Sequence, residues 1–189
     1  VGAHLERWGV PEERLRELDW QESTKIAGLT LTATPARHFC GRGLRNRQHT
    51  LWASWVVAGE RHRVFHSGDT GYFPGFKDIG SAYGPFDTTM IQIGAYSEFW
   101  RDIHMTPDEG VRAHLDLQGS RQLQASHDLQ SSPDLQGSHD FQTARDLQSP
   151  PGLQGDKSAA PLLPIHWATF NLAPHAWAEP GEWTMHAAH

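Results

Sequence analysis

The sequence is short of cysteine, of long apolar runs and of positive charge, and each shortage excludes a class of protein. Cys40 is the only cysteine among 189 residues, so no disulfide can form within the chain and a reducing, cytoplasmic compartment is predicted. No apolar stretch reaches the roughly 18–20 residues that a membrane-spanning helix needs. Sixteen Lys and Arg against 22 Asp and Glu give a formal charge of −6, which argues against a nucleic-acid partner.

Two common catalytic motifs are also missing. The sequence has no G-x-x-x-x-G-K-[ST] loop, which disfavours a P-loop nucleotide site, and no G-x-S-x-G elbow, which disfavours a serine nucleophile. Histidine, in contrast, is abundant, with 13 His against three Tyr. Because histidine serves both as a metal ligand and as an acid–base group, the composition favours metal or acid–base chemistry.

Residues 116–157 form a tandem repeat of six-residue units. The units read DLQGSR, QLQASH, DLQSSP, DLQGSH, DFQTAR, DLQSPP and GLQGDK. An even period would place every apolar residue on one face of an extended chain, as in a hexapeptide solenoid. Only one residue in six is apolar, however, and Pro133, Pro150 and Pro151 interrupt the run. We therefore predict a mostly disordered insertion within one domain that spans residues 1–189.

The rest of the chain alternates predicted strands with predicted helices. Thr106-Pro107-Asp108-Glu109 is a capping box with proline at the first helical position, and it predicts a helix over 107–117. Pro11 and the two acidic residues after it predict a helical turn. The segment after 166 is predicted to be a polar tail punctuated by proline. Strands are predicted at 29–34, 51–58, 62–67, 87–93 and 162–166, with the second and third forming a hairpin. This order predicts a layered α/β (α+β) domain.

Three polar residues follow predicted strands. His38 comes after strand 29–34, Asp69 lies in a glycine-flanked turn after Val64-Phe65, and His166 ends the last predicted strand. Loops at strand ends are where a rigid sheet presents functional groups, and imidazole and carboxylate groups are ligands for Zn²⁺. Each residue also has an ordinary structural explanation, so the spacing leaves both a metal site and a structural role open.

Around these residues the sequence resembles the metallo-β-lactamase-fold hydrolases, and among them the N-acyl-phosphatidylethanolamine-hydrolysing phospholipase D family and its bacterial relatives. The resemblance implies an αββα sandwich with a two-metal site, usually zinc, and a phospholipid or other phosphodiester as substrate, with peripheral contact to a membrane. The stretches that carry it are TPARHFCGRGLRNRQHTLWASWVV (34–57), FHSGDTGYFPGFKDIGSAYGPFD (65–87), IQIGAY (91–96), HMTPDEGVRAHLDLQ (104–118) and LLPIHWATFNLAPHAWAEP (162–180).

The resemblance also implies a role for each candidate. His38 corresponds to a ligand of the first metal, Asp69 to the carboxylate that bridges both metals, and His166 to a ligand of the second metal. His104 resembles a histidine near the substrate phosphate and would be catalytic together with Asp69, as a hydrogen-bond donor or acid–base group. We expect His38, Asp69 and His166 to converge at one edge of a sheet, with His104 slightly farther out. Five aromatic residues have two open interpretations, as core residues or as the lining of a lipid groove: Trp52, Trp55, Phe99, Trp100 and Trp167.

The sequence departs from the family at one decisive point. The motif H-x-H-x-D-H, which supplies four ligands in the family, does not occur in the sequence, and residues 1–20 resemble the stretch that follows it. The chain is therefore expected to be the C-terminal half of the domain, a partial αββα sandwich with an incomplete zinc site and no activity alone. Two alternatives stay open: a truncated, non-catalytic remnant, and a lactone or ester hydrolase of the same superfamily.

Overall fold

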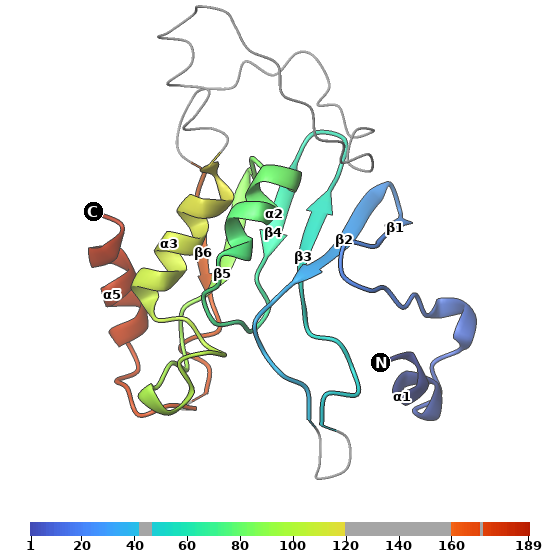
Figure 1. Cartoon of the computed structure of the whole chain (residues 1–189), viewed down its shortest axis with the longest axis horizontal. Helices are drawn as coiled ribbons and strands as arrows, with labels where there is room; N and C mark the ends of the chain where they lie inside the picture. Colours follow the sequence, from blue (N-terminus) through green and yellow to red (C-terminus); the bar gives the residue numbers. More distant parts are fainter. Residues whose placement is uncertain (42–46, 120–159, 171) are drawn as a thin grey trace, which may run out of the picture.

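The computed structural model of the chain describes residues 1–41, 47–119, 160–170 and 172–189, and its centre is a six-stranded sheet (Figure 1). The strands lie side by side in the order in which they occur along the chain. They are β1 (Ser23–Ile26), β2 (Leu29–Pro35), β3 (Ala53–Ala58), β4 (Arg63–His66), β5 (Thr88–Gln92) and β6 (Leu162–Ile165).

The direction of the strands decides where their ends lie. β1 to β4 pair antiparallel, whereas β4, β5 and β6 pair parallel. Since β2 and β4 both run opposite to β3, they run in the same direction as β5 and β6. The loops that follow β2, β4, β5 and β6 therefore all leave the sheet at one edge, which we call the carboxyl edge.

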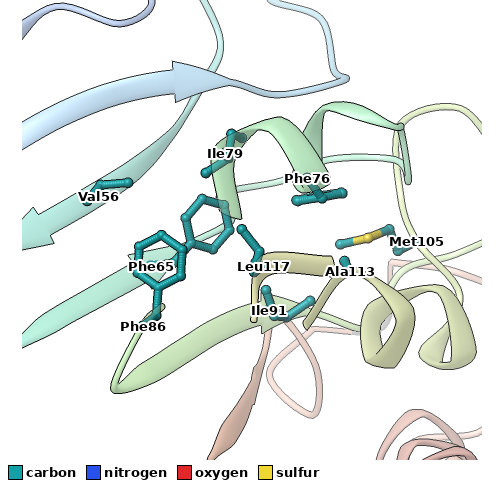
Figure 2. Close-up of a cluster of buried hydrophobic side chains, with 9 residues drawn as sticks. All are labelled: Val56, Phe65, Phe76, Ile79, Phe86, Ile91, Met105, Ala113 and Leu117. Carbon is teal, nitrogen blue, oxygen red and sulfur yellow. The ribbon is translucent and has the colours of Figure 1, made fainter. Parts of the chain in front are cut away.

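Helices α2 (Gly75–Tyr83) and α3 (Pro107–Leu117) follow β4 and β5, and α5 (Glu179–Ala187) packs beside α3 (Figure 1). The other short elements are α1 (Gly2–Arg7) and the 3-10 helices η1 (Glu12–Arg14) and η2 (Glu98–Trp100). The hydrophobic core lies between the sheet and the helices α2 and α3 (Figure 2). It consists of Val56, Phe65, Phe76, Ile79, Phe86, Ile91, Met105, Ala113 and Leu117.

Most predicted elements are present, and the α/β (α+β) fold class is confirmed. The hairpin forms as β3 and β4, and α3 begins at Pro107 with both hydrogen bonds of the capping box. The helical turn predicted at Pro11 is the 3-10 helix η1. The prediction of a tail after 166 is wrong in part, because its last residues form α5, with Pro180 in the first turn and two acidic residues near the helix N-terminus.

β2 buries two of its threonine residues. The alternation of Leu29, Leu31 and Ala33 with Thr30, Thr32 and Thr34 is typical of a half-buried strand. In the structure Thr32 and Thr34 are buried and Leu29 is 42% exposed. The hydroxyl of Thr32 lies 2.7 Å from that of Ser23 on β1, so a neighbouring strand supplies the polar partner that permits burial.

Most of the predicted insertion lies outside the described residues. The first residues of the repeat, Asp116 and Leu117, end α3, and residues 120–157 are not described. The single-domain boundary of 1–189, with 116–157 as an insertion, stays a prediction. Among the described helices, none combines the length and the apolar character needed to cross a bilayer.

Candidate metal centre

Four titratable side chains meet at the carboxyl edge of the sheet. His38 lies in the loop after β2, Asp69 in the turn after β4, His104 between β5 and α3, and His166 directly after β6. Because these four strands end at the same edge, residues up to 128 positions apart (38 to 166) come together. The convergence predicted for His38, Asp69 and His166 is therefore present in the fold.

The nitrogen and oxygen atoms of this cluster lie at distances suited to a cation. His38, Asp69 and His104 each offer one ligand atom, and these atoms all lie within 4.8 Å of one another. The Nε2 atoms of His38 and His104 are 3.4 Å apart. Two nitrogen ligands of a tetrahedral zinc ion are separated by about 3.3 Å when each Zn–N bond is about 2.05 Å. The two imidazoles are therefore spaced as a pair of zinc ligands would be.

The backbone fixes which nitrogen of each ring faces this centre. Nδ1 of His104 lies 2.9 Å from the carbonyl oxygen of Ala95, and Nδ1 of His38 lies 2.8 Å from that of Phe39. A carbonyl oxygen only accepts, so in both rings Nδ1 carries the proton and donates it. In the neutral rings the two Nε2 lone pairs then face each other, an arrangement that a cation between them stabilises. The donor set thus fits a divalent metal ion.

His166 forms a hydrogen bond with Asp69. Its Nε2 lies 3.3 Å from Oδ1 of Asp69, and the hydrogen bond from His166 lowers the pKa of the Asp69 carboxyl group. The same hydrogen bond raises the pKa of His166. Burial is the main cause of the lowered pKa of His104, and the neighbouring His166 adds to it. Near neutral pH, Asp69 is therefore ionised and His104 is neutral, the states in which each can bind a metal ion.

Thr70, next to Asp69 in the chain, ties three of the loops together. Its buried hydroxyl accepts a hydrogen bond from the Arg37 backbone N–H at 2.8 Å and donates one to the carbonyl of Gly71 at 2.8 Å. Its own carbonyl accepts from the backbone N–H of Met105 at 3.1 Å. The loops that carry His38, Asp69 and His104 are thus held in register by one residue.

Gln92 supports the same region from the end of β5. Its side chain is fully buried; Oε1 accepts from the Met105 N–H at 3.1 Å, and Nε2 donates to the carbonyl of Gly94. Sequence reasoning missed both Thr70 and Gln92. A glutamine inside an otherwise apolar and threonine-rich strand was the available signal, because a buried amide must find partners.

Backbone conformation near the centre is unusual as well. Ala95 and His166 have φ of 58° and 63°, in the left-handed region that non-glycine residues rarely adopt. Gly68, directly before Asp69, has φ of 62° and would bring a Cβ atom to 2.9 Å from the carbonyl oxygen of Ala53. Strained backbone of this kind gathers at functional sites, where the surrounding structure enforces it.

The structure corrects one detail of the predicted arrangement. His104 was expected slightly outside the other three residues, facing a substrate. Instead its ring stacks on that of His38 at 5.5 Å between centroids and meets that of His166 edge-on at 5.1 Å. The hydrogen bond to Ala95 turns its Nε2 atom inward, and no feature of the sequence predicts that contact. The roles assigned to the four residues stay predictions.

Two cavities flank the cluster. An apolar pocket of about 280 Å³ opens beside His166, and its walls include Trp167, Phe170, Leu172 and Trp177. Phe170, Leu172 and Trp177 are each more than half exposed. A second cavity of about 470 Å³, next to His104, is lined mostly by polar residues, among them Ser97, Arg101, Asp108 and Glu109. Of the aromatic residues singled out in the sequence, Trp167 lines the apolar pocket.

Comparison with known proteins agrees with this architecture. Residues 1–127 match the beta-lactamase superfamily domain. An uncharacterised protein of Mycobacterium tuberculosis is 44% identical over 188 residues, which cover 100% of this chain and 40% of that protein. The N-acyl-phosphatidylethanolamine-hydrolyzing phospholipase D 1 of Caenorhabditis elegans is 44% identical over 105 residues, covering 52% of this chain and 30% of that enzyme.

The fold also has a counterpart among solved structures. An isothiocyanate hydrolase from Delia radicum gut bacteria aligns with a TM-score of 0.52 and 13% identity, over 90% of this chain and 52% of that one. At this identity the likeness concerns the fold alone. Together with the sequence matches it confirms the resemblance inferred from the motifs. The chain spans 40% of the length of its mycobacterial relative.

Proposed function

Because the chain belongs to the beta-lactamase superfamily, we propose that it forms part of a metal-dependent hydrolase of phosphodiesters. The observation that carries this proposal is the convergence of two imidazoles and a carboxylate, from His38, His104 and Asp69, with ligand atoms all within 4.8 Å. A phospholipid of the N-acylphosphatidylethanolamine type is the first substrate to test, since a relative named for that activity is 44% identical over 105 residues.

The resident cofactor is proposed to be a divalent metal ion, with zinc favoured by the mixed nitrogen and oxygen donors. In the complete protein the resemblance assigns His38, Asp69 and His166 as ligands of two ions and His104 as the acid–base group. In this chain, which contains no H-x-H-x-D-H motif, we propose that one ion is held by His38, Asp69 and His104. When bound, such an ion acts as a Lewis acid toward a phosphoryl oxygen and lowers the pKa of water.

The chain's own residues would contribute orientation and proton transfer. In the complete protein, where the resemblance makes His104 the acid–base group and not a ligand, its lowered pKa leaves Nε2 able to accept a proton, and the carbonyl of Ala95 holds its ring in one tautomer. The hydrogen bond with Asp69 raises the pKa of His166 and holds its Nε2 atom toward that carboxylate. His104 is therefore the candidate base, while Asp69 and His166 hold each other in place.

The apolar pocket beside His166 favours a substrate with a hydrocarbon portion. Its exposed aromatic and aliphatic walls share His166 with the cluster, so an acyl chain seated there would hold its head group next to Asp69. Pockets that combine apolar walls with a few convergent polar groups are typical of small-molecule sites. Peripheral contact with a membrane, from which such a lipid would be drawn, is part of this proposal.

The proposal is tested with the complete gene product, identified by reading the upstream DNA for an in-frame H-x-H-x-D-H motif. That protein is assayed for release of phosphatidic acid from N-acylphosphatidylethanolamine, with Asp69→Asn as the inactive variant and the exposed His186→Ala as the matched control. Release that Asp69→Asn abolishes and His186→Ala leaves unchanged supports the proposal. Cleavage of a lactone or simple ester instead would establish the alternative hydrolase, and absence of the motif together with absence of turnover would establish a non-catalytic remnant.

A further inference from the structure

His175, in the loop before α5, makes a hydrogen bond that leads directly to the candidate metal centre. Its Nε2 atom accepts from the backbone N–H of Ala95 at 3.1 Å, and its Nδ1 lies 3.2 Å from the carbonyl oxygen of Ala176. Because that carbonyl can only accept, His175 carries its proton on Nδ1 and presents a lone pair to Ala95. Both ring nitrogens of His175 are therefore used in holding the backbone.

The backbone of Ala95 connects His175 to His104. The carbonyl oxygen of Ala95 accepts from Nδ1 of His104 at 2.9 Å and from Nε1 of Trp100 at 2.7 Å. Ala95 is buried and has φ of 58°, so its conformation depends on the groups around it. A residue held at its N–H by one histidine thus orients a second histidine through its C=O.

α5 fixes His175 in turn. The ring of His175 stacks on Tyr96 with 4.5 Å between centroids and 20° between planes, and Trp183 of α5 packs edge-on against Tyr96 at 5.5 Å. The hydroxyl of Tyr96 hydrogen-bonds the carboxylate of Glu179, the first residue of α5, whose backbone N–H donates to the carbonyl of Ala176. The orientation of His175 is therefore set by the aromatic and polar contacts of the C-terminal helix.

We propose that His175 is a positioning residue, which holds His104 in the Nδ1–H tautomer through the peptide of Ala95 so that Nε2 of His104 faces the metal centre. The importance of this role for catalysis rests on the proposed function, whereas the hydrogen bonds that set the tautomer of His104 do not depend on it. Removal of a group that hydrogen-bonds a metal ligand and orients it typically lowers metal affinity 10–100-fold. No sequence motif and no family resemblance assigns a role to His175.

Two substitutions separate the hydrogen bond from the stacking. His175→Phe keeps a ring against Tyr96 but removes the acceptor, whereas His175→Gln places its side-chain oxygen close to the position of Nε2 and keeps the acceptor. In the metal-free chain, long-range ¹H–¹⁵N correlations report the tautomer of His104. Hydrogen exchange measures the protection of the Ala95 amide. We expect His175→Phe to give a mixture of His104 tautomers and roughly tenfold faster Ala95 exchange, and His175→Gln to resemble the unmodified chain.

Zinc affinity, measured by competition with a chelator, provides the second readout. It is expected to fall roughly tenfold in His175→Phe and to recover in His175→Gln, with the exposed His186→Phe as the matched control. A single Nδ1–H tautomer of His104 retained in His175→Phe would overturn the proposal, whatever the affinity. If the unmodified chain bound no zinc while the tautomer still shifted, the one-ion site proposed for this chain would fail and the positioning role of His175 would stand.

Discussion

Gly94 and His166 approach each other so closely that a Cβ atom on Gly94 would lie 2.3 Å from the carbonyl oxygen of His166. The same atom would lie 2.9 Å from Cβ of Trp167. Glycine is therefore required where the loop after β5 crosses the loop after β6, and this contact places His166 relative to His104.

The substitution Gly94→Ala is expected to destabilise the fold by about 1–3 kcal/mol, the usual cost of overpacking a tightly packed site. The backbone at His166 cannot yield without moving its side chain away from Asp69. Chemical denaturation measures the free energy of unfolding. Gly119→Ala, where an added Cβ meets nothing within 4 Å, serves as the control. Equal stability of the two variants would contradict the close contact.

Thr70→Val should cost about 0.5–1.5 kcal/mol, because it removes the acceptor of the part-buried Arg37 N–H while keeping nearly the same side-chain volume. Thr70→Ser keeps the hydroxyl and should lose much less. The comparison of the two variants by denaturant unfolding isolates the hydrogen bond from the packing. Equal stability of Thr70→Val and Thr70→Ser would show that the hydroxyl of Thr70 does not hold the loops together.

Zinc binding by this chain alone should stay well under two equivalents, with one weakly held ion at most and negligible phosphodiesterase activity. His38, Asp69 and His104 offer three ligand atoms, and a second ion would need ligands that this sequence lacks. Calorimetric titration with Zn²⁺ gives the stoichiometry. Two tightly bound ions per chain, with turnover, would refute this expectation.

Separate substitutions of the histidines should distinguish ligands from neighbours. His104→Asn and His38→Asn should each weaken zinc binding by roughly tenfold or more, because the two Nε2 atoms are spaced as zinc ligands at 3.4 Å. An acid–base role outside the ligand set, which the resemblance implies, predicts instead that His104→Asn leaves the affinity unchanged. Chelator competition at fixed pH decides between these two roles.

His114 on α3 should make the fold sensitive to acid. Burial lowers its pKa, and its Nδ1 atom lies 2.7 Å from the hydroxyl of Thr89 on β5. The unfolded chain therefore binds a proton at a higher pH than the folded chain does, so stability falls as the pH drops below about 6.5. The raised pKa of His166 has the opposite effect on stability. Its hydrogen bond with Asp69 stabilises the fold fully below about pH 6.5, and this stabilisation is lost as the pH rises.

The contribution of His114 is isolated by comparison with His114→Gln. Between about pH 7.5 and about pH 5 the free energy of unfolding should decline less steeply in this variant. Denaturant unfolding at several pH values provides the slopes. Parallel slopes for the two proteins would mean that His114 does not titrate differently on folding.

The sequence predicted those elements whose signal is local. The capping box at Thr106 and Glu109 requires only four consecutive residues, and it placed the start of α3 correctly. α2 was missed although Phe76, Ile79 and Tyr83 have helical spacing, because three glycines between 75 and 84 weaken the helical signal. β1 was missed because it is a short, largely exposed edge strand without an alternating apolar pattern.

The site was predictable in its membership but not in its internal arrangement. The resemblance placed His38, Asp69, His104 and His166 together, and the common direction of their strands explains why they meet. Which nitrogen each imidazole turns inward depends on the backbone carbonyls of Phe39 and Ala95. The first contact joins neighbouring residues and the second joins residues nine positions apart, and neither leaves a pattern in the sequence because each depends on the backbone conformation of its loop.

The connection between α3 and β6 begins and ends away from this cluster. α3 starts beside His104 and runs from the carboxyl edge toward the opposite edge, where β6 starts its return to His166 (Figure 1). Most of the hexapeptide units lie in this connection, so a change in their number leaves the length of every loop that carries a site residue unchanged. We therefore expect repeat number and chemistry to vary independently.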